Sequence, residues 1–334
     1  MRFSKTAAAS VSEAPTLASK LGIDEDFLKQ NNAVTNIPKV IGHRCALYDQ
    51  PENTVPSLEA AAGHGAKAVE IDVVRLKCGR LAVFHGDGSD EDPGGLLSYC
   101  GVDGSILDLT AAEARGLRFV GDAHFCPSET LDGAGIPFLE EFLQHAKDMD
   151  MEVKIELKGP GTEEPVIEMV EAMGMIDKVT FSSFIHERIH NVRKLRPQLH
   201  SDGTHVYRTG ALFAELPADF IERAKTVDAT EVHLRYDFCN RERVDAIHDA
   251  GLDSMGWFRG PHNMKRDIDY FSDLEDEDEA LYGMVALSGV QAMCVNRPDR
   301  LIRMVSNMES SLSGSEEWSD ASIRTEDEDE GNSD

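Results

Sequence analysis

Residues 68–73 read Ala-Val-Glu-Ile-Asp-Val, and this stretch decides how the rest of the chain is interpreted. Its apolar residues are typical of a buried strand, whereas Glu70 and Asp72 are side chains that such a strand avoids. Side chains at i and i+2 of a strand point to the same face, so the two carboxylates converge. At about 4 Å and an effective dielectric constant near 20, their repulsion is roughly 4 kcal/mol. A bound divalent cation is the simplest partner that would relieve it.

Short β-rich runs alternate with helical patterns along most of the chain. Strands are expected at 39–44, 68–73, 81–85, 152–157, 178–183, 199–206, 231–236, 253–258 and 291–295. Helices are expected at about 55–65, 138–149, 163–173, 186–196, 217–225, 241–250 and 298–308. This alternation is typical of a parallel sheet covered by helices. We therefore expect an α/β fold, a TIM-barrel-like (β/α)8 domain.

The second and third expected strands are too close for a helical crossover. Glu70 and His85 are only fifteen residues apart, and residues 77–80, Lys-Cys-Gly-Arg, are typical of a turn. Parallel neighbours need a crossover of a dozen or more residues. The third strand is therefore expected to fold back as a hairpin-like early strand pair, with His85 across from Glu70. This pairing also explains why nine candidate strands compete for eight barrel places.

The charge of the chain is strongly negative, at −28 for 334 residues. This charge argues against nucleic acid or an anionic membrane as an unassisted partner. Residues 309–334 contain ten acidic residues against Arg324 alone, which predicts a disordered acidic tail. We expect an N-terminal arm at 1–36 and a single barrel domain at 37–308 before that tail.

Cysteine usage and hydropathy indicate the compartment. The six cysteines show no CxxC spacing, and no secretory hydrophobic region precedes them, so reduced thiols are expected. No stretch approaches eighteen apolar residues, and no transmembrane segment is expected. We expect a cytoplasmic protein. The Ala/Ser-rich first thirty residues, with Arg2 and Lys5, leave organellar targeting open, although Glu13 and three acids at 24–26 oppose a transit peptide.

Two segments break the α/β rhythm. Residues 86–136 are rich in Gly and Asp and carry only a short helical pattern from Thr110 to Arg115. Long segments of this kind are usually functional or disordered. Residues 272–279 form an acid run, for which we expect a solvated surface turn.

Polar residues follow or end four of the expected strands. They are His43 with Arg44, Glu70 with Asp72, His85, and Glu156 with Lys158. In a barrel of βα units the active site gathers at the C-terminal ends of the strands. These side chains are therefore expected to meet at one end of the barrel. A salt-bridge network of the carboxylates with Arg44 and Lys158 is the structural alternative.

The pattern resembles the glycerophosphodiester phosphodiesterases, within the phosphatidylinositol-phospholipase-C-like phosphodiesterases. The resemblance spans about residues 39–303. It rests on Gly42-His43-Arg44, Pro51-Glu52-Asn53-Thr54, Gly65-Ala66, Glu70-Ile71-Asp72-Val73, Lys77-Cys78-Gly79 before His85, Glu156-Leu157-Lys158, Ser183-Phe184, Leu195-Arg196-Pro197, Trp257 and Arg297-Pro298-Asp299. No single motif decides the matter, but their order and spacing together are specific.

The resemblance implies a metal site. Glu70, Asp72 and Glu156 would bind one divalent cation, Mg²⁺ or Ca²⁺. Hard carboxylate oxygens suit such an ion and do not suit zinc.

The resemblance also implies the catalytic and substrate-binding residues. His43 and His85 would be the acid/base pair, one taking a proton from the nucleophile and the other giving one to the leaving alcohol. Arg44 would clamp the phosphate with its planar donor fork, and Lys158 would add positive charge beside it. For Trp257, core packing and a wall of the substrate pocket are both open.

The implied reaction is metal-dependent hydrolysis of a glycerophosphodiester to glycerol 3-phosphate and an alcohol. It would proceed in one step or through a cyclic phosphate, and glycerophosphocholine or glycerophosphoethanolamine would be natural substrates. One alternative is a lysophospholipase D or sphingomyelinase-D-like phosphodiesterase, which would need an apolar groove for a lipid tail. Another is a catalytically silent barrel that acts as a binding protein, with the acidic tail recruiting a basic partner.

Several positions depart from the family pattern. Cys45 stands where glycine is usual, Cys78 replaces an acid, Gly86 separates His85 from Asp87, Asn296 replaces an aspartate, and residues 258–260 read Phe-Arg-Gly. None removes an implied ligand. The side chain of Cys45 is expected to crowd the phosphate or to demand a different backbone turn. Residues 86–136 match the family poorly in places and are expected to set substrate choice.

Overall fold

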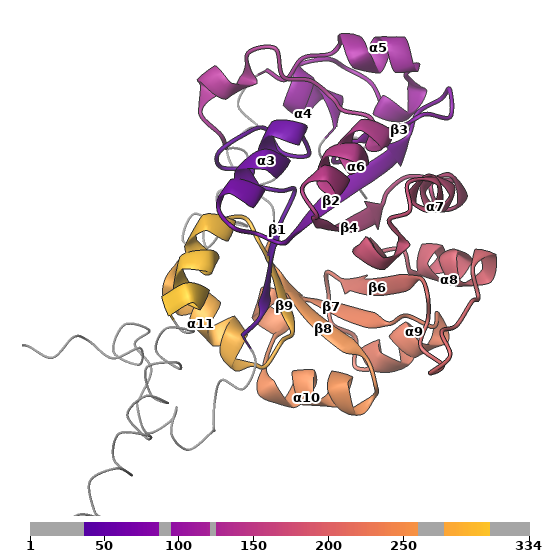
Figure 1. Ribbon diagram of the computed structural model, residues 1–334, viewed down its shortest axis with the longest axis vertical. Coiled ribbons are helices and arrows are strands. Elements are labelled where there is room, and N and C mark those ends of the chain that lie inside the picture. The colour runs from indigo at the N-terminus through magenta and orange to yellow at the C-terminus, as the bar shows by residue number, and fades with distance from the viewer. Residues whose placement is uncertain (1–36, 87–94, 121–124, 260–276, 308–334) are drawn as a thin grey trace, which may run out of the picture.

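The computed structural model describes residues 37–86, 95–120, 125–259 and 277–307 (Figure 1). Its centre is a barrel of eight parallel strands. In order around the barrel they are β1 (Lys39–Gly42), β2 (Ala68–Arg75), β4 (Glu152–Leu157), β5 (Val179–Ser183), β6 (Arg208–Phe213), β7 (Glu231–Arg235), β8 (Asp253–Trp257) and β9 (Ala292–Val295). Because β1 pairs with both β9 and β2, the sheet is closed. The expected TIM-barrel-like (β/α)8 fold is confirmed.

The remaining strand, β3 (Leu81–Val83), runs antiparallel to β2. This confirms the hairpin-like early pair. The register differs from the expected one. Phe84 pairs with Asp72, since its N–H donates to the carbonyl oxygen of Asp72 at 2.9 Å. His85 therefore lies one residue beyond the partner of Asp72, and not directly across from Glu70.

Helices cover the outside of the barrel. They are α3 (Val55–Gly63), α6 (Leu139–Asp148), α7 (Glu163–Ala172), α8 (His186–Leu195), α9 (Phe220–Thr226), α10 (Arg241–Asp249), α11 (Glu279–Leu287) and a helix at 298–307. All were expected within a few residues except α11. That helix follows the acid run, and Asp278 caps it by accepting a hydrogen bond from the N–H of Leu281 at 2.8 Å.

The strand expected at 199–206 is wrong. This segment forms only an isolated bridge between Leu199 and His205, and residues 201–203 turn in between. The barrel strand β6 begins instead at Arg208, and residues 209–213 are buried. Burial inside a closed barrel, which the local alternation of the sequence does not report, decides which segment joins the sheet.

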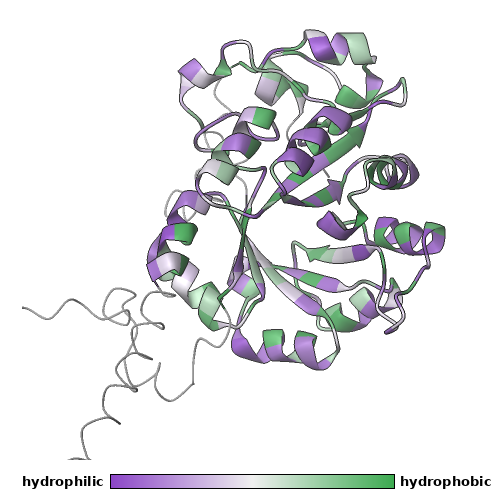
Figure 2. Ribbon diagram, in the orientation of Figure 1, coloured by the Kyte–Doolittle hydropathy of each residue, from purple (hydrophilic) through white to green (hydrophobic). Residues whose placement is uncertain are grey.

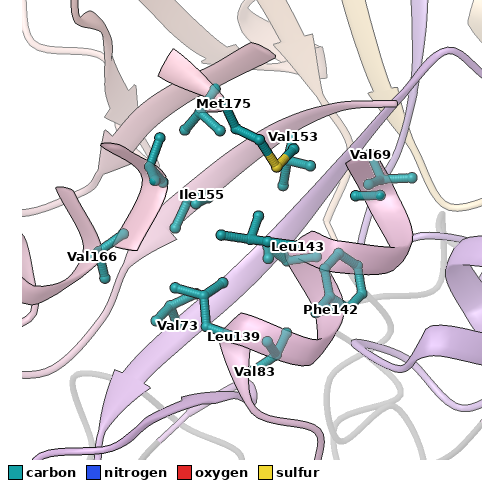
Figure 3. Close-up of a cluster of buried hydrophobic side chains, with 14 of the residues drawn as sticks. Val69, Val73, Val83, Leu139, Phe142, Leu143, Val153, Ile155, Val166 and Met175 are labelled. Carbon is teal, nitrogen blue, oxygen red and sulfur yellow. The ribbon is translucent and has the colours of Figure 1, made fainter. Parts of the chain in front are cut away.

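The strands separate apolar from charged residues by their alternation. Val69 and Val73 of β2 and Val153 and Ile155 of β4 pack against α6 and α7 in one apolar cluster, together with Phe142 (Figure 3). Their neighbours in the sequence must face the barrel interior. The covering helices carry both hydrophilic and hydrophobic residues, as Figure 2 shows, which suits one face in water and one on the sheet.

Residues 84–138, between β3 and α6, are here called the insert. Its described parts contain α4 (Leu96–Cys100), η1 (Ile106–Asp108), α5 (Ala111–Gly116) and η2 (Ser128–Leu131). The helical pattern expected from Thr110 is confirmed, and Thr110 and Glu113 form a capping box. An apolar cluster that includes Phe84, Tyr99 and Phe138 holds the insert together.

Several expectations fall on residues outside the described ranges. The N-terminal arm at 1–36, the acidic tail at 309–334 and residues 272–276 of the acid run are among them, so disorder in the tail and organellar targeting stay predictions. All six cysteines are described, and all are free thiols. Among the helices of the described ranges, none is long and apolar enough to cross a membrane.

Candidate active site

Three carboxylates meet at the C-terminal end of the barrel. Glu70 and Asp72 lie on β2, and the parallel register places Asp72 beside Glu156 of β4. Carboxylate oxygens from all three lie within 4.8 Å of one another, and all three residues are buried. The structure therefore brings together the trio for which a metal was predicted, although they come from strands separated by more than seventy residues of chain.

The electrostatics of this trio call for positive charge. Burial, followed by repulsion from Asp72 and Glu156, raises the pKa of Glu70 well above its usual value of 4.5. Close, buried carboxylates cannot all ionise unless cations compensate them. Three hard oxygen donors at this spacing fit a divalent cation such as Mg²⁺ or Ca²⁺, so the trio could hold a metal ion.

Two basic residues offset part of the negative charge. The Nζ of Lys158 lies 3.1 Å from Oε1 of Glu156 and 3.6 Å from Oδ1 of Asp72. The Nε of Arg44 lies 3.5 Å from Oδ2 of Asp72, and its backbone N–H donates to Oε2 of Glu70 at 3.1 Å. The salt bridges of the structural alternative are thus present, but they do not exclude a metal.

Arg44 is held from its other side by the loop after β1 and by the insert. Its Nη1 donates to Oε1 of Glu52 at 3.0 Å and lies 3.5 Å from the hydroxyl oxygen of Tyr99. Burial alone would lower the pKa of Arg44, but Glu52, Tyr99 and Asp72 raise it above its usual value. The guanidinium therefore stays charged beside the carboxylates.

His43 follows β1 and faces the carboxylate trio. Its Nδ1 lies 2.8 Å from Oδ1 of Asn296, and its Nε2 lies 3.8 Å from Oε2 of Glu70. Burial, followed by the charge of Arg44, lowers the pKa of His43 to about 3. The imidazole is therefore neutral at physiological pH.

His85 follows β3 at the start of the insert and reaches the same end of the barrel. Its ring lies 6.5 Å from that of Tyr99, edge to face, and its carbonyl oxygen accepts from the N–H of Gly95 at 3.3 Å. His85 is 8% exposed. Through Tyr99 it belongs to the same group of side chains as Arg44.

Trp257 ends β8 and lines the barrel interior. It packs with Ile41 and Met255, and its ring meets that of Phe184 edge to face at 5.4 Å. Its indole Nε1 is buried without a hydrogen-bond partner among the described residues. A buried indole donor normally finds a partner, which is consistent with a pocket wall as well as with core packing.

Comparison with known proteins now decides the family. Residues 43–300 match the model of the glycerophosphoryl diester phosphodiesterase family. The chain belongs to this family. A glycerophosphodiester phosphodiesterase from Caldanaerobacter subterraneus is 27% identical over 271 residues, covering 80% of this chain and 97% of the relative. One from Bacillus altitudinis is 35% identical over 167 residues, covering 48% and 64% of the two chains.

Solved structures agree with this assignment. A protein from Galdieria sulphuraria, assigned as a glycerophosphodiester phosphodiesterase, aligns with a TM-score of 0.66 at 25% identity, covering 81% of this chain and 98% of that one. A phosphodiesterase from Oleispira antarctica, solved with the product sn-glycerol-3-phosphate, has the same fold, with a TM-score of 0.63 at 23% identity, covering 81% and 97%. The resemblance and the class of phosphoric diester hydrolase are confirmed.

Asn53 holds one of the carboxylates in place. The sequence had given this residue no role in the glycerophosphodiester phosphodiesterase site. Its Nδ2 donates to Oδ2 of Asp72 at 2.9 Å, and its Oδ1 accepts from the N–H of Asp72 at 3.1 Å. Asn53 adopts a left-handed φ of 59°, which asparagine tolerates better than most residues. The motif Pro51-Glu52-Asn53-Thr54 signalled the position but not this contact.

Glu277 was missed because it belongs to the acid run. It is 2% exposed and accepts hydrogen bonds from Tyr282 and Asn296, so the expectation of a solvated surface turn is wrong for this residue. Burial raises the pKa of Glu277 to about 7, although these hydrogen bonds oppose the shift. The acidic composition of residues 272–279 predicted exposure to solvent, but tertiary packing buries one of these acids, Glu277.

The turn after β1 accommodates Cys45 in a strained conformation. Cys45 has a φ of 76°, which favours glycine, and its side chain packs in the apolar cluster with Leu58 and Ala61. Of the two expectations for Cys45, the structure shows the unusual backbone turn, in which Cys45 adopts a strained, positive φ. Gly42 makes the turn possible, because a Cβ there would lie 2.3 Å from the carbonyl oxygen of Cys45.

Proposed function

We propose that this chain hydrolyses a glycerophosphodiester to glycerol 3-phosphate and an alcohol. The observation that carries the proposal is the trio of buried carboxylates beside the Nε2 of His43, at the barrel end where such enzymes work. Mg²⁺ or Ca²⁺ bound by Glu70, Asp72 and Glu156 would stabilise the negative charge that builds at phosphorus.

The side chains around the trio supply the remaining chemistry. His43 takes a proton from the nucleophile at Nε2, because its Nδ1 is committed to Asn296. His85 gives a proton to the leaving alcohol. Arg44 and Lys158 hold the phosphate, and Trp257 offers its indole N–H to the substrate. Attack by water and attack by a neighbouring hydroxyl, through a cyclic phosphate, would both use these roles.

The relatives support this substrate class. The chain covers 97% of the Caldanaerobacter relative, which is named a glycerophosphodiester phosphodiesterase. The Oleispira protein binds sn-glycerol-3-phosphate, the product that the proposed reaction would release. Glycerophosphocholine and glycerophosphoethanolamine are therefore the substrates to test first.

A second candidate is a lysophospholipase D or sphingomyelinase-D-like activity on lipid-tailed substrates. Phe184 and Ile185, directly after β5, are 37% and 50% exposed, and Phe184 contacts Trp257. These residues offer some apolar surface to a lipid tail. Release of choline from lysophosphatidylcholine, and none from glycerophosphocholine, would reverse our order of preference.

The deciding experiment combines one substitution with chelation. His43→Ala should lower turnover of glycerophosphocholine by roughly 10²-fold or more, the usual size of a general acid or base contribution. EDTA should abolish activity, and Mg²⁺ or Ca²⁺ should restore it. His145→Ala, on the exposed face of α6, is the matched control and should keep full activity. Unchanged turnover in His43→Ala would refute the role of His43, and indifference to EDTA would contradict a metal at the carboxylate trio. A folded wild-type protein with no turnover of any glycerophosphodiester would be the silent barrel.

The proposal extends to the domain and the compartment. We place the catalytic domain at 37–308, so that removal of 309–334 should leave turnover unchanged. Six free thiols favour a reducing compartment, and we propose the cytoplasm. Recovery of the native protein from an organellar fraction would overturn that location.

A further inference from the structure

Asn296, directly after β9, connects His43 to a buried group that the proposed chemistry does not use. Its Nδ2 donates to Oε1 of Glu277 at 2.5 Å and to the carbonyl oxygen of Arg259 at 2.6 Å. Two acceptors on this side fix the orientation of the amide, because a flipped Asn296 would turn its Oδ1 toward both. Its Oδ1 must therefore face Nδ1 of His43, which lies 2.8 Å away.

Within the described part of the chain, the groups that hydrogen-bond to the carboxylate of Glu277 are donors. Its Oε2 accepts from the hydroxyl of Tyr282 at 2.5 Å and from the backbone N–H of Asn296 at 3.1 Å, while its Oε1 accepts from Nδ2 of Asn296. Such a site needs acceptor atoms, and an amide in place of the carboxylate would leave a donor facing a donor. The acceptor oxygens of Glu277 therefore act together with the carbonyl oxygen of Arg259 to set which way the amide of Asn296 points.

The orientation of Asn296 matters because His43 has two competing tautomers. Oε2 of Glu70, 3.8 Å from Nε2, attracts a proton to that nitrogen. With Nε2 protonated, the imidazole would have no lone pair on the side of the carboxylates. An acceptor at Nδ1 favours the opposite tautomer, with Nδ1 protonated and Nε2 bare.

We propose that Glu277 is a positioning residue which, through Asn296, holds His43 as the Nδ1–H tautomer with the Nε2 lone pair directed at the carboxylate trio. The proposal rests on the role of His43 under the proposed function. It assigns a task to an acidic residue 234 positions away in the chain, in a run whose composition is that of a solvated turn.

Glu277→Gln is the first test. The oxygen of the introduced amide must keep accepting from the hydroxyl of Tyr282 and from the backbone N–H of Asn296. Its NH₂ group then faces Nδ2 of Asn296, so that two donors meet. A flip of the Asn296 amide relieves this clash but presents a donor to His43, which selects the wrong tautomer. We expect kcat to fall by roughly 10²-fold, the size of a lost general base, with KM little changed.

A double variant tests the direction of the hydrogen bonds. In Glu277→Gln with Asn296→Asp, the new carboxylate accepts both from the introduced amide and from Nδ1–H of His43. This variant should recover most of the kcat that the single variant loses, although both variants sacrifice the bond to Arg259. If the double variant is no faster than the single one, the polarity of this contact is not what matters, and the proposal fails.

A matched control separates positioning from stability. Glu171 accepts from the hydroxyl of Tyr207 at 2.6 Å, as Glu277 does from Tyr282, but it lies on α7 and also pairs with Arg196. Glu171→Gln should lower the melting temperature and leave kcat and KM unchanged. Equal losses of kcat in Glu171→Gln and Glu277→Gln would show a general effect of stability and would contradict the proposal.

The ¹⁵N chemical shifts of the His43 ring give a readout independent of turnover. The signal is assigned by its loss in His43→Gln. The wild-type protein should show a protonated Nδ1 and a bare Nε2, and Glu277→Gln should reverse or mix the two. An unchanged tautomer in Glu277→Gln overturns the proposal. If His43→Ala keeps full activity, the catalytic role of His43 under the proposed function fails, and the ring shifts still decide whether Glu277 positions His43.

Discussion

Among the described residues, charged side chains gather inside the barrel in two clusters, one at the mouth and one below it. The mouth has the carboxylate trio with Arg44 and Lys158. The lower one, here called the floor cluster, consists of Lys154, Thr180, Arg208, Glu231 and His233. In the floor cluster Glu231 is surrounded: Lys154 lies 2.6 Å away, Arg208 2.7 Å and His233 2.8 Å.

One carboxylate in each cluster, Glu70 at the mouth and Glu231 in the floor cluster, has a shifted pKa, and the two shifts are opposite. Burial alone would raise the pKa of Glu231, but Lys154 and His233 hold it well below its usual value. At the mouth, burial and two further carboxylates raise the pKa of Glu70 well above that value. Lys154 and Glu156 are two residues apart on β4. A buried acid with its cations in place is structural, whereas a buried acid with too few cations marks a site for a ligand.

The largest expected effect sharpens this contrast through activity. Glu156→Gln removes one of the three acids of the mouth and should lower turnover by roughly 10²-fold or more, since several kcal/mol of charge stabilisation are lost. Glu231→Gln removes the acid of the floor cluster and should leave the turnover of folded protein near the wild-type value. Steady-state kinetics in saturating Mg²⁺ measure both. Equal losses of turnover would erase the distinction.

Stability should show the reverse order. Glu231→Gln leaves the buried Lys154 without its acid and removes a partner of the half-exposed Arg208. It should lower the free energy of unfolding by about 3 kcal/mol or more. Glu156→Gln relieves repulsion at the mouth and should be far less destabilising in metal-free protein. Urea unfolding in EDTA compares the two variants. A Glu156→Gln protein as unstable as Glu231→Gln would mean that the mouth is also a satisfied network.

The response to metal should depend on pH. Because the folded pKa of Glu70 is raised, its contribution to stability is present below about pH 4.5 and is lost as the pH rises through the folded value. A metal that replaces the proton should therefore stabilise the protein more at pH 8 than at pH 5. At a hundred times its Kd at pH 8, the gain at that pH should be about 3 kcal/mol. Thermal melting with and without Mg²⁺ measures this gain. Glu70→Gln should abolish the pH dependence, and an equal gain at both pH values would argue against a carboxylate site.

The smallest expected effect concerns packing in the floor cluster. A Cβ at Gly210 of β6 would lie 2.1 Å from the ring of His233. Gly210→Ala should therefore lower the free energy of unfolding by about 1–3 kcal/mol, the usual cost of overpacking, and should leave kcat unchanged. Chemical denaturation and kinetics on the same preparation test both parts. A loss of kcat without a loss of stability would connect the floor to catalysis.

Much of this architecture follows from the sequence. The alternation in residues 68–73 predicted that Glu70 and Asp72 share a face, and the short chain between Glu70 and His85 predicted the hairpin. The strand β6 was placed too early, since its burial inside the barrel is not visible in the local alternation, and it contains Gly210, a residue that strands usually lack. Glycine is needed at this position because the ring of His233, on the neighbouring strand, occupies the space that a Cβ would take. A local sequence pattern does not reveal this requirement.

The parts of the site that could not be predicted depend on how distant segments approach. Asn53 belongs to a motif of the family, but its hydrogen bonds with Asp72 depend on its left-handed backbone conformation, which the sequence does not show. Asn296 was noted only as a departure from the family. Glu277 was grouped with acids that suit water, and only the packing of α11 against the barrel reveals its burial.

The antiparallel strand β3 has an evolutionary consequence. It leads the chain out of the barrel into the insert (Figure 1). The insert is stabilised by its own apolar cluster and contacts Arg44 through Tyr99. A lineage can therefore lengthen or exchange the outer loops of the insert while the barrel keeps its architecture. Sequence divergence among relatives should therefore concentrate in the insert, so that the same barrel acquires new substrate preferences when the insert changes.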